Sequence, residues 1–263
     1  MDPVELATRE HANMIATLTL LGANVDGAFV RRADGVAILA TGLQIILFNQ
    51  VIVDGEETTP AAISAGVGVM RGRGEPFVVN LRVGTDDRFV WLMEQLGLVP
   101  LSEHPWLPGM ALHPLPDGPA PIAAPGHEIR RVTDVAGLED HIRTAVAGFD
   151  LPEAIVRPVM ATDLLETEAA TVYVGYTDGE PVTTGLGFRS GDTIGVYNIA
   201  TLPSARKRGY GAAMTARIAA DGAAAGCDVA ILQATAMGRP VYERLGYRTV
   251  VEYMGYVEPP TPG

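Results

Sequence analysis

The spacing of apolar residues alternates between a helical period and runs of β-branched residues, which predicts a mixed α/β protein. Asp-Gly and Gly-Asp pairs separate several of the apolar runs and indicate β-hairpins. In the first half the pattern predicts, in chain order, a helix over 4–21, strands over 28–53 that break at 33–35 and at Gly42, a helix over 61–70 ending at a loop over 71–74, a strand over 77–83 and a helix over 86–96.

A stretch rich in proline, residues 100–126, separates this first half from a second one. We therefore predict a domain over 1–115 with a last strand over 110–113, a linker over 116–126 and a domain over 127–263. Within the second domain the pattern predicts a strand over 128–132, helices over 135–147 and 153–165, strands over 170–177, 181–189 and 194–201, a helix ending near Ala225, a strand over 228–235, a helix over 239–245 and a strand over 247–257.

The two halves resemble degenerate copies of one unit. An offset of 149 residues pairs Asn49 with Asn198 and also pairs Leu96-Gly97 with Leu245-Gly246. The triplet Thr-Gly-Leu and the turn Asp-Gly also occur once in each half at corresponding places, at 41–43 and 184–186 and at 34–35 and 178–179. We interpret this pattern as a duplication of one fold.

The clearest chemical motif lies at 197–213, where a predicted strand runs through a Pro203 turn into a predicted helix. Three consecutive cations and two glycines fill the turn, at 206–208, Gly209 and Gly211. Free amides at a helix N-terminus, the helix dipole and nearby cations together favour a phosphate or diphosphate. A Walker loop would need Lys-Ser/Thr after Gly211, and a dinucleotide fingerprint would need Gly or Ala where Met214 stands.

The spacing Arg206-x-x-Gly209-x-Gly211, after the strand 197–203, resembles the acyl-CoA motif of the GNAT (Gcn5-related) N-acetyltransferases. The resemblance implies two tandem GNAT-like domains, each with a mixed, mostly antiparallel twisted sheet flanked by helices. It also implies that the fourth and fifth strands of the second domain splay apart to admit the pantetheine arm of acetyl-CoA. The residues it assigns to acetyl-CoA are Ile199, Ala200, Thr201, Arg206, Lys207, Arg208, Gly209, Tyr210, Gly211, Ala212 and Thr235.

Tyr242 is the predicted general acid. It precedes Gly246-Tyr247 by four residues, as a tyrosine does in the last motif of this family, and a phenol keeps its proton at neutral pH. An asparagine often found before this tyrosine in the family is absent, and Thr235 is the nearest polar residue. No general base is identified: Asn198 either orients a water or satisfies a strand bulge, and Glu166 and Glu168 are the nearest alternatives.

The first half has lost this motif. The 149-residue offset places Glu57, Pro60 and Ala62 opposite Arg206, Gly209 and Gly211. A carboxylate repels phosphate and proline has no amide donor. Met93, which cannot transfer a proton, stands opposite Tyr242, and the basic run 71–74 lies at the wrong end of its predicted helix. We therefore expect the first half to keep the scaffold without the site.

Composition limits the partners. The net charge of −12 argues against nucleic-acid binding. It either serves solubility alone or also suits a cationic amine acceptor. The single cysteine, Cys227, excludes an intramolecular disulfide, and no His/Cys cluster has metal-ligand spacing, so no metal is expected.

Residues 36–53 are strongly apolar, but polar residues interrupt them, which predicts buried strands and not a membrane span. The acidic N-terminus lacks the basic start of a signal peptide, so we expect a cytoplasmic protein, and a homodimer is compatible with the sequence. Two functions stay open: an N-acetyltransferase that uses acetyl-CoA and a primary amine, and an acyl-CoA-binding sensor without catalysis.

Overall fold

The structure, a computed structural model, describes residues 1–116, 118 and 126–260. The predicted linker over 116–126 lies almost entirely outside these described residues. The first half contains α1 (Pro3–Ala23), β1 (Phe29–Ala33), β2 (Val36–Ala40), β3 (Asn49–Val53), α2 (Pro60–Arg73), β4 (Val78–Arg82), α3 (Val90–Gln95), β5 (Val99–Pro100) and β6 (Leu107–Leu112), with short 3₁₀ turns at η1 (Ile46–Phe48) and η2 (Asp87–Phe89).

The second half follows the predicted order closely. Its elements are β7 (His127–Arg131), α4 (Val135–Phe149), α5 (Glu153–Val159), η3 (Thr162–Leu165), β8 (Ala170–Thr177), β9 (Glu180–Ser190), β10 (Thr193–Thr201), η4 (Pro203–Ala205), α6 (Tyr210–Ala224), β11 (Val229–Gln233), α7 (Arg239–Arg244) and β12 (Arg248–Val257).

Three helix predictions need correction. The predicted helix over 153–165 ends at Val159 because Pro158 interrupts it, and a 3₁₀ turn follows. The predicted helix over 86–96 is likewise split into η2 and α3. The run 71–74 is not a loop: α2 continues through Arg73, and Gly74 ends it in the left-handed conformation with φ 70°.

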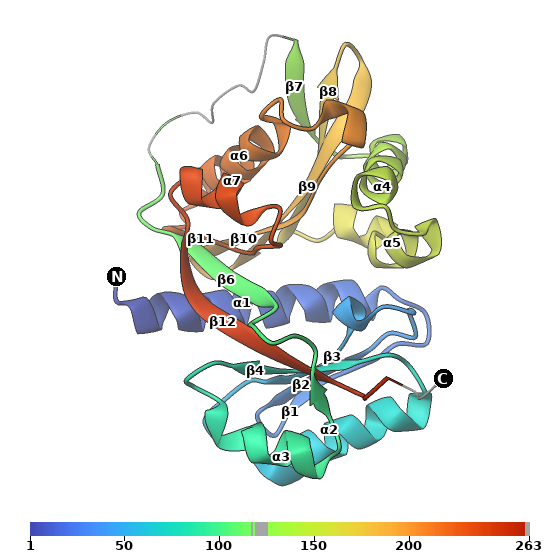
Figure 1. The fold of residues 1–263 in the computed structure, drawn as a ribbon. Helices are drawn as coiled ribbons and strands as arrows, with labels where there is room; N and C mark the ends of the chain where they lie inside the picture. Colours follow the sequence, from blue (N-terminus) through green and yellow to red (C-terminus); the bar gives the residue numbers. More distant parts are fainter. Residues whose placement is uncertain (117, 119–125, 261–263) are drawn as a thin grey trace.

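In the described residues, the two halves share one twisted, mostly antiparallel sheet of twelve strands. Its order is β1-β2-β3-β4-β12-β6-β11-β10-β9-β8-β7, and β5 pairs with β12 beside this path. Strand β6 of the first half pairs with β11, while β12, the last strand of the chain, pairs with β4. The predicted domains therefore separate the two copies along the chain, whereas in space the last strand of each copy lies among the strands of the other (Figure 1).

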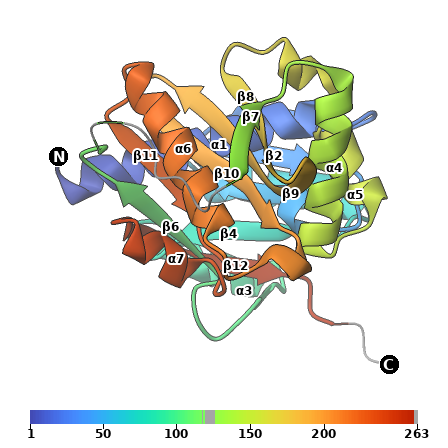
Figure 2. The ribbon, with the colours of Figure 1, turned by 90° about the horizontal axis from the view of Figure 1, so that it is seen from above.

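Helix α1 lies across the middle of this sheet, where the two halves meet (Figures 1 and 2). Asp2 caps its first turn by accepting a hydrogen bond from the amide of Val4. One apolar face of α1 packs on both halves, in a cluster formed by Met14, Ile15, Leu18, Ala37, Leu39, Ile52, Val251 and Tyr253. Because α1 buries surface from both halves, it holds them together.

Candidate functional site

The loop before α6 offers a row of backbone amides. In the described part of the chain, no carbonyl or side chain accepts a hydrogen bond from the N–H groups of residues 207–212. Lys207 and Gly209 both have positive φ, 64° and 84°. Residues with alternating signs of φ turn successive amides toward one concave surface, which binds anions. The backbone therefore presents a row of unbonded amides at the place where the sequence predicts a cradle for a diphosphate.

The cations of this loop divide into two groups. The Arg206 guanidinium donates hydrogen bonds to the carbonyls of Gly148, at 2.8 Å, and of Thr201, at 3.3 Å. Lys207 and Arg208 are exposed and form no ion pair with any described residue. Arg206 therefore fastens the loop to α4 and β10, while its two neighbours are exposed, and its contact with a phosphate stays a prediction.

Strands β10 and β11 separate next to this loop. Strand β10 pairs with β9 along its length, but its parallel pairing with β11 covers only residues 193–195. A bulge follows at 198–199, where Asn198 has φ 54°. Past the bulge, a Cβ on Gly211 would stand 3.5 Å from Thr201 Oγ1 and 3.7 Å from Ile199 Cγ2. The fold therefore brings the loop next to the unpaired part of β10, at the place where the family resemblance implies that the strands splay apart.

The first half lacks this opening. The offset of 149 aligns residues 50–52 with 199–201, and residues 50–52 are paired in parallel with β4. In addition, the carboxylate of Glu57 lies against Gly55, just before α2. A closed pair of strands and a carboxylate at the helix start agree with the expectation that this copy has lost the site.

A buried histidine holds the bulge in β10. His141, on α4, is fully buried, and its Nδ1 lies 3.0 Å from the carbonyl of Tyr173, which can only accept. Its Nε2 therefore carries a lone pair and accepts from Asn198 Nδ2 at 2.8 Å. The carbonyl of Asn198 also accepts from Thr184 Oγ1 at 2.9 Å. These contacts favour the bulge-forming role for Asn198 over the orientation of a water.

Burial of His141 is expected to make stability depend on pH. Desolvation lowers its pKa from 6.5 to about 4, so the unfolded chain binds a proton that the folded protein excludes. The free energy of unfolding should then fall as pH drops from 6.5 toward 4, by at most about 1.4 kcal/mol per pH unit from this group. Urea denaturation at pH 7 and pH 5 measures this loss.

His141→Gln is the matched variant, because its amide can donate to Tyr173 and accept from Asn198 without titrating. Burial also shifts the pKa of Glu10 to about 7 and that of His11 to about 4, so both contribute to the pH dependence of stability. Their contributions are the same in wild type and variant. The variant should lose about 2 kcal/mol less than wild type between pH 7 and pH 5. Equal losses in the two proteins would show that His141 is not the group that excludes the proton.

Tyr242 lies beyond the end of β11, on the short helix α7. Its ring covers Gly238 and meets Tyr247 edge-on, with ring centroids 6.1 Å apart. Burial raises the pKa of its hydroxyl to about 12, and no described residue hydrogen bonds to that hydroxyl. Thr235 accepts from the amide of Gly238 at 3.1 Å and so fixes the turn into α7. Tyr242 and Ile199 pack on the same apolar cluster beside α6.

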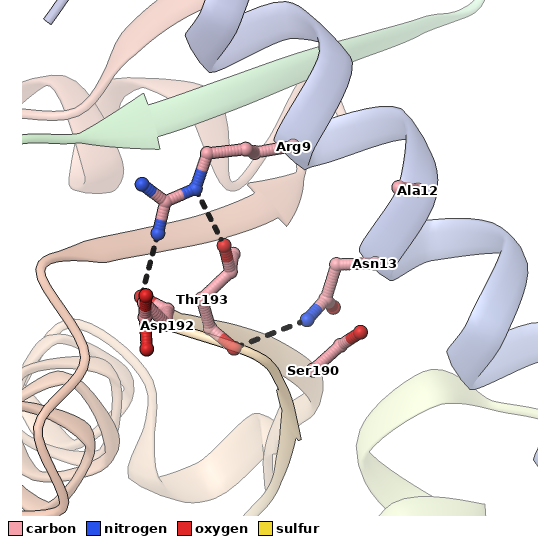
Figure 3. Close-up of a pocket in the computed structure, with 6 residues that line it drawn as sticks. All are labelled: Arg9, Ala12, Asn13, Ser190, Asp192 and Thr193. Atoms are coloured by element: carbon pink, nitrogen blue, oxygen red, sulfur yellow. Dashed lines mark hydrogen bonds between the residues drawn. The ribbon is translucent and has the colours of Figure 1, made fainter.

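The other candidate carboxylates lie elsewhere. Glu166 and Glu168 line a cavity of about 290 Å³ at the start of β8, together with Arg131 and Leu164. A second cavity, of about 310 Å³, lies between α1 and the β9–β10 turn (Figure 3). Arg9 crosses it to reach the carbonyl of Asp192 at 2.7 Å. Both cavities lie near the end of the sheet where β10 is paired with β11 and β8 begins. The loop at 207–212 follows the opposite end of β10.

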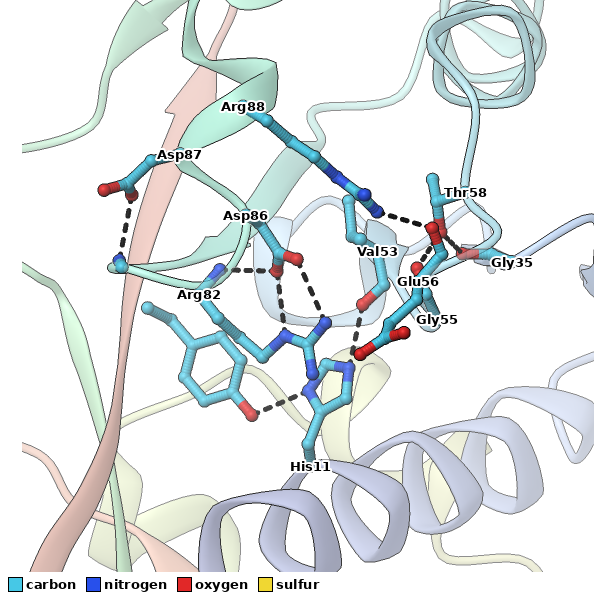
Figure 4. Close-up of polar contacts among 12 residues, drawn as sticks. His11, Gly35, Val53, Gly55, Glu56, Thr58, Arg82, Asp86, Asp87 and Arg88 are labelled. Carbon is cyan, nitrogen blue, oxygen red and sulfur yellow. Dashed lines mark hydrogen bonds and ion pairs between the residues drawn. The ribbon is translucent and has the colours of Figure 1, made fainter. Parts of the chain in front are cut away.

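The sequence interpretation missed the polar cluster under α1. Glu10 and His11, both fully or almost fully buried, lie between the two halves with Tyr253. Figure 4 shows His11 with its polar neighbours. Two adjacent ionisable residues in an apolar helix were the available signal. Among the described residues, no three His, Cys, Asp or Glu side chains gather as metal ligands, and none of the described helices has both the length and the apolar character needed to cross a membrane.

Comparison with known proteins gives a family match for the second half. A family model described as an acetyltransferase (GNAT) domain matches residues 168–249. No curated protein matches the chain. The match confirms the resemblance predicted from the loop and strand motifs.

Solved structures match nearly the whole chain. A GCN5-related N-acetyltransferase from Kribbella flavida has a TM-score of 0.67 at 18% identity, covering 97% of this chain and 96% of that one. One from Sphaerobacter thermophilus has a TM-score of 0.61 at 15% identity, with coverages of 89% and 84%. A tandem GNAT protein from the clavulanic acid biosynthesis pathway has a TM-score of 0.57 at 12% identity, with coverages of 89% and 80%. These structures confirm the predicted tandem fold.

Proposed function

Because residues 168–249 match a GNAT acetyltransferase domain within a tandem GNAT fold, we propose that this protein transfers an acetyl group from acetyl-CoA to a primary amine. The observation that carries the proposal is the row of unbonded amides at 207–212 beside the opening between β10 and β11. Either feature alone occurs in many proteins, but together they suit a long ligand with a diphosphate at one end and an extended arm at the other.

The described residues fit acetyl-CoA in three places. The amides from Arg208 to Ala212 bind the diphosphate, and Lys207 and Arg208 add positive charge. The edge of 199–201 that is not paired with β11 bonds to the amide groups of the pantetheine arm. The arm then carries the thioester into the opening between the strands, toward Tyr242.

The chemistry needs a neutral amine and a proton for the departing sulfur. The amine nitrogen forms a bond to the acetyl carbon as the carbon–sulfur bond breaks. The Tyr242 hydroxyl, whose pKa is raised to about 12 by burial, keeps its proton at neutral pH and donates it to the thiolate. The acidic protein surface, with a net charge of −12, attracts a cationic amine.

One observation favours the alternative, an acyl-CoA sensor without catalysis. The polar side chains of β10 near the bulge are Tyr197, Asn198 and Thr201, and none of them is a carboxylate. Binding and turnover separate the two functions. Calorimetry with acetyl-CoA tests binding, and release of free CoA thiol in the presence of a panel of primary amines tests transfer.

Binding with amine-dependent thiol release supports the acetyltransferase. Binding without thiol release across the panel supports the sensor. The absence of acetyl-CoA binding in calorimetry would contradict both functions.

A further inference from the structure

Helix α1 of the first half places a buried carboxylate against the strands of the second half. Glu10 is fully buried, and its Oε1 accepts from Gln233 Nε2 at 2.5 Å. Its Oε2 lies 2.7 Å from the Tyr253 hydroxyl. The carboxylate also lies against Gly109 of β6, where a Cβ would collide with it. The absence of a side chain at Gly109 therefore provides the space that the Glu10 carboxylate occupies.

Gln233 marks the narrow end of the opening between β10 and β11. The last pair in register is Gly195 with Ile231, and alternate residues of a strand point to the same face. Tyr197 and Gln233 are thus the next side chains on the face covered by α1, one on each separating strand. The Tyr197 hydroxyl is held by Asn13 Oδ1 of α1 at 2.7 Å. The Glu10 carboxylate accordingly lies over β6 and β12, and Gln233 joins it to the narrow end of the opening.

The hydrogen bonds that link Glu10, Tyr253 and His11 can accommodate one additional proton, on the carboxyl of Glu10. His11 Nε2 lies 2.8 Å from the carbonyl of Val53, which can only accept, so Nε2 carries hydrogen (Figure 4). Neutral His11 then has a lone pair at Nδ1, 2.9 Å from the Tyr253 hydroxyl. That hydroxyl has one hydrogen: it donates to Glu10 when the carboxylate is ionised, and it can donate to His11 when the carboxyl carries a proton and donates to the Tyr253 oxygen.

The groups that face Glu10 set its affinity for this proton. His11 on α1, Tyr253 on β12, Tyr197 on β10 and Arg82 on β4 surround it. Arg82 is itself paired with Asp86, at 2.8 Å, which weakens its influence (Figure 4). Burial outweighs the hydrogen bonds from Gln233 and Tyr253 and the charge of Arg82, and it raises the pKa of Glu10 to about 7. A group that titrates near neutral pH can both take up and release a proton.

We propose that Glu10, contributed by the first half, accepts the proton of the substrate amine at the opening in the second half. The inference rests on the proposed acetyltransferase function. Glu10 takes one proton from the ammonium group, and the free amine then bonds to the acetyl carbon. The carbon–sulfur bond breaks, and Tyr242 gives its proton to the departing sulfur. A second proton from the nitrogen then reprotonates Tyr242. Glu10 releases the first proton to solvent. The products are the amide, free CoA thiol and one proton.

Glu10→Gln tests this role without changing the size of the side chain. We expect kcat/KM to fall by about 10²- to 10⁴-fold, the usual contribution of a positioned base. In wild type, kcat/KM should rise through about pH 7, and this rise should be lost in the variant. Glu5→Gln, on the exposed part of the same helix, is the control and should retain the wild-type profile. A pH profile in Glu10→Gln with the wild-type rise overturns the inference.

A second measurement needs no amine. The carboxyl ¹³C resonance of Glu10, assigned by its loss in Glu10→Gln, should titrate near pH 7 and move to a higher midpoint when acetyl-CoA is saturating, because the bound acetyl group further excludes water. An unchanged midpoint would show that Glu10 does not adjoin the acyl group and overturns the inference. Calorimetry on the same sample keeps the two failures apart, since only the absence of acetyl-CoA binding contradicts the proposed function itself.

Discussion

Gly211→Trp is expected to abolish acetyl-CoA binding and leave the protein folded. Gly211 lies in the first turn of α6, and its Cβ direction points to Thr201 and Ile199 at the entrance of the opening. An indole there fills the space between the loop and the splayed strand. We expect the dissociation constant in calorimetry to rise at least about 100-fold, equivalent to about 2.7 kcal/mol.

Gly211→Ala is the matched control for this substitution. Its methyl group would stand 3.5 Å from Thr201 Oγ1 and 3.7 Å from Ile199 Cγ2, which are ordinary contacts. Alanine also favours a helix over glycine by up to about 1 kcal/mol. The alanine variant should therefore bind acetyl-CoA and unfold at no lower temperature than wild type. Tight binding by the tryptophan variant would mean that the ligand does not pass between the loop and β10.

Tyr242→Phe is expected to slow acetyl transfer by about 10²- to 10⁴-fold, the range typical of a lost general acid. Phenylalanine keeps the ring that packs on Gly238 and Tyr247, and the lost hydroxyl has no hydrogen-bond partner among the described residues. The loss should fall on kcat, while calorimetry should give the wild-type affinity for acetyl-CoA. Thermal unfolding should also be unchanged.

The pH dependence supplies a further check on Tyr242. Burial raises its pKa to about 12, so the hydroxyl should stay protonated, and active, across the neutral and mildly alkaline range. Wild-type transfer should therefore show no decline from this group below about pH 10. Equal turnover in Tyr242→Phe and wild type, across the amine panel, would remove Tyr242 from the mechanism.

The first half has a clear structural use although its own opening is closed. Its strand β6 lies between β11 and β12, and its helix α1 covers the face on which Tyr197 and Gln233 emerge. A copy that no longer binds a ligand can still supply strands and side chains to the other copy. This arrangement is compatible with the expectation that the first half keeps the scaffold, with Glu57 and Pro60 at the positions that align with the loop of the second half.

The sequence by itself determined the order of the elements, the turn at Pro203, the unbonded amides from 207 to 212 and the loss of that loop in the first half. These features depend on residues close together in the chain: apolar periodicity, Gly209 with positive φ, and a helix start. The engagement of Arg206 with the carbonyl of Gly148 could not be predicted in this way, because its partner lies 58 residues earlier.

Only the tertiary structure determined which strands pair with the last strand of each half. It also determined that α1 places Glu10 beside Gln233. Strands β6 and β12 are the last strands of two similar copies. The local sequence pattern therefore does not determine which strands each of them pairs with. Glu10 and Gln233 are 223 residues apart, and nothing near either one in the chain indicates the other. Their contact arises because α1 packs across strands of both halves of one open sheet, and burial in that shared core then raises the pKa of Glu10.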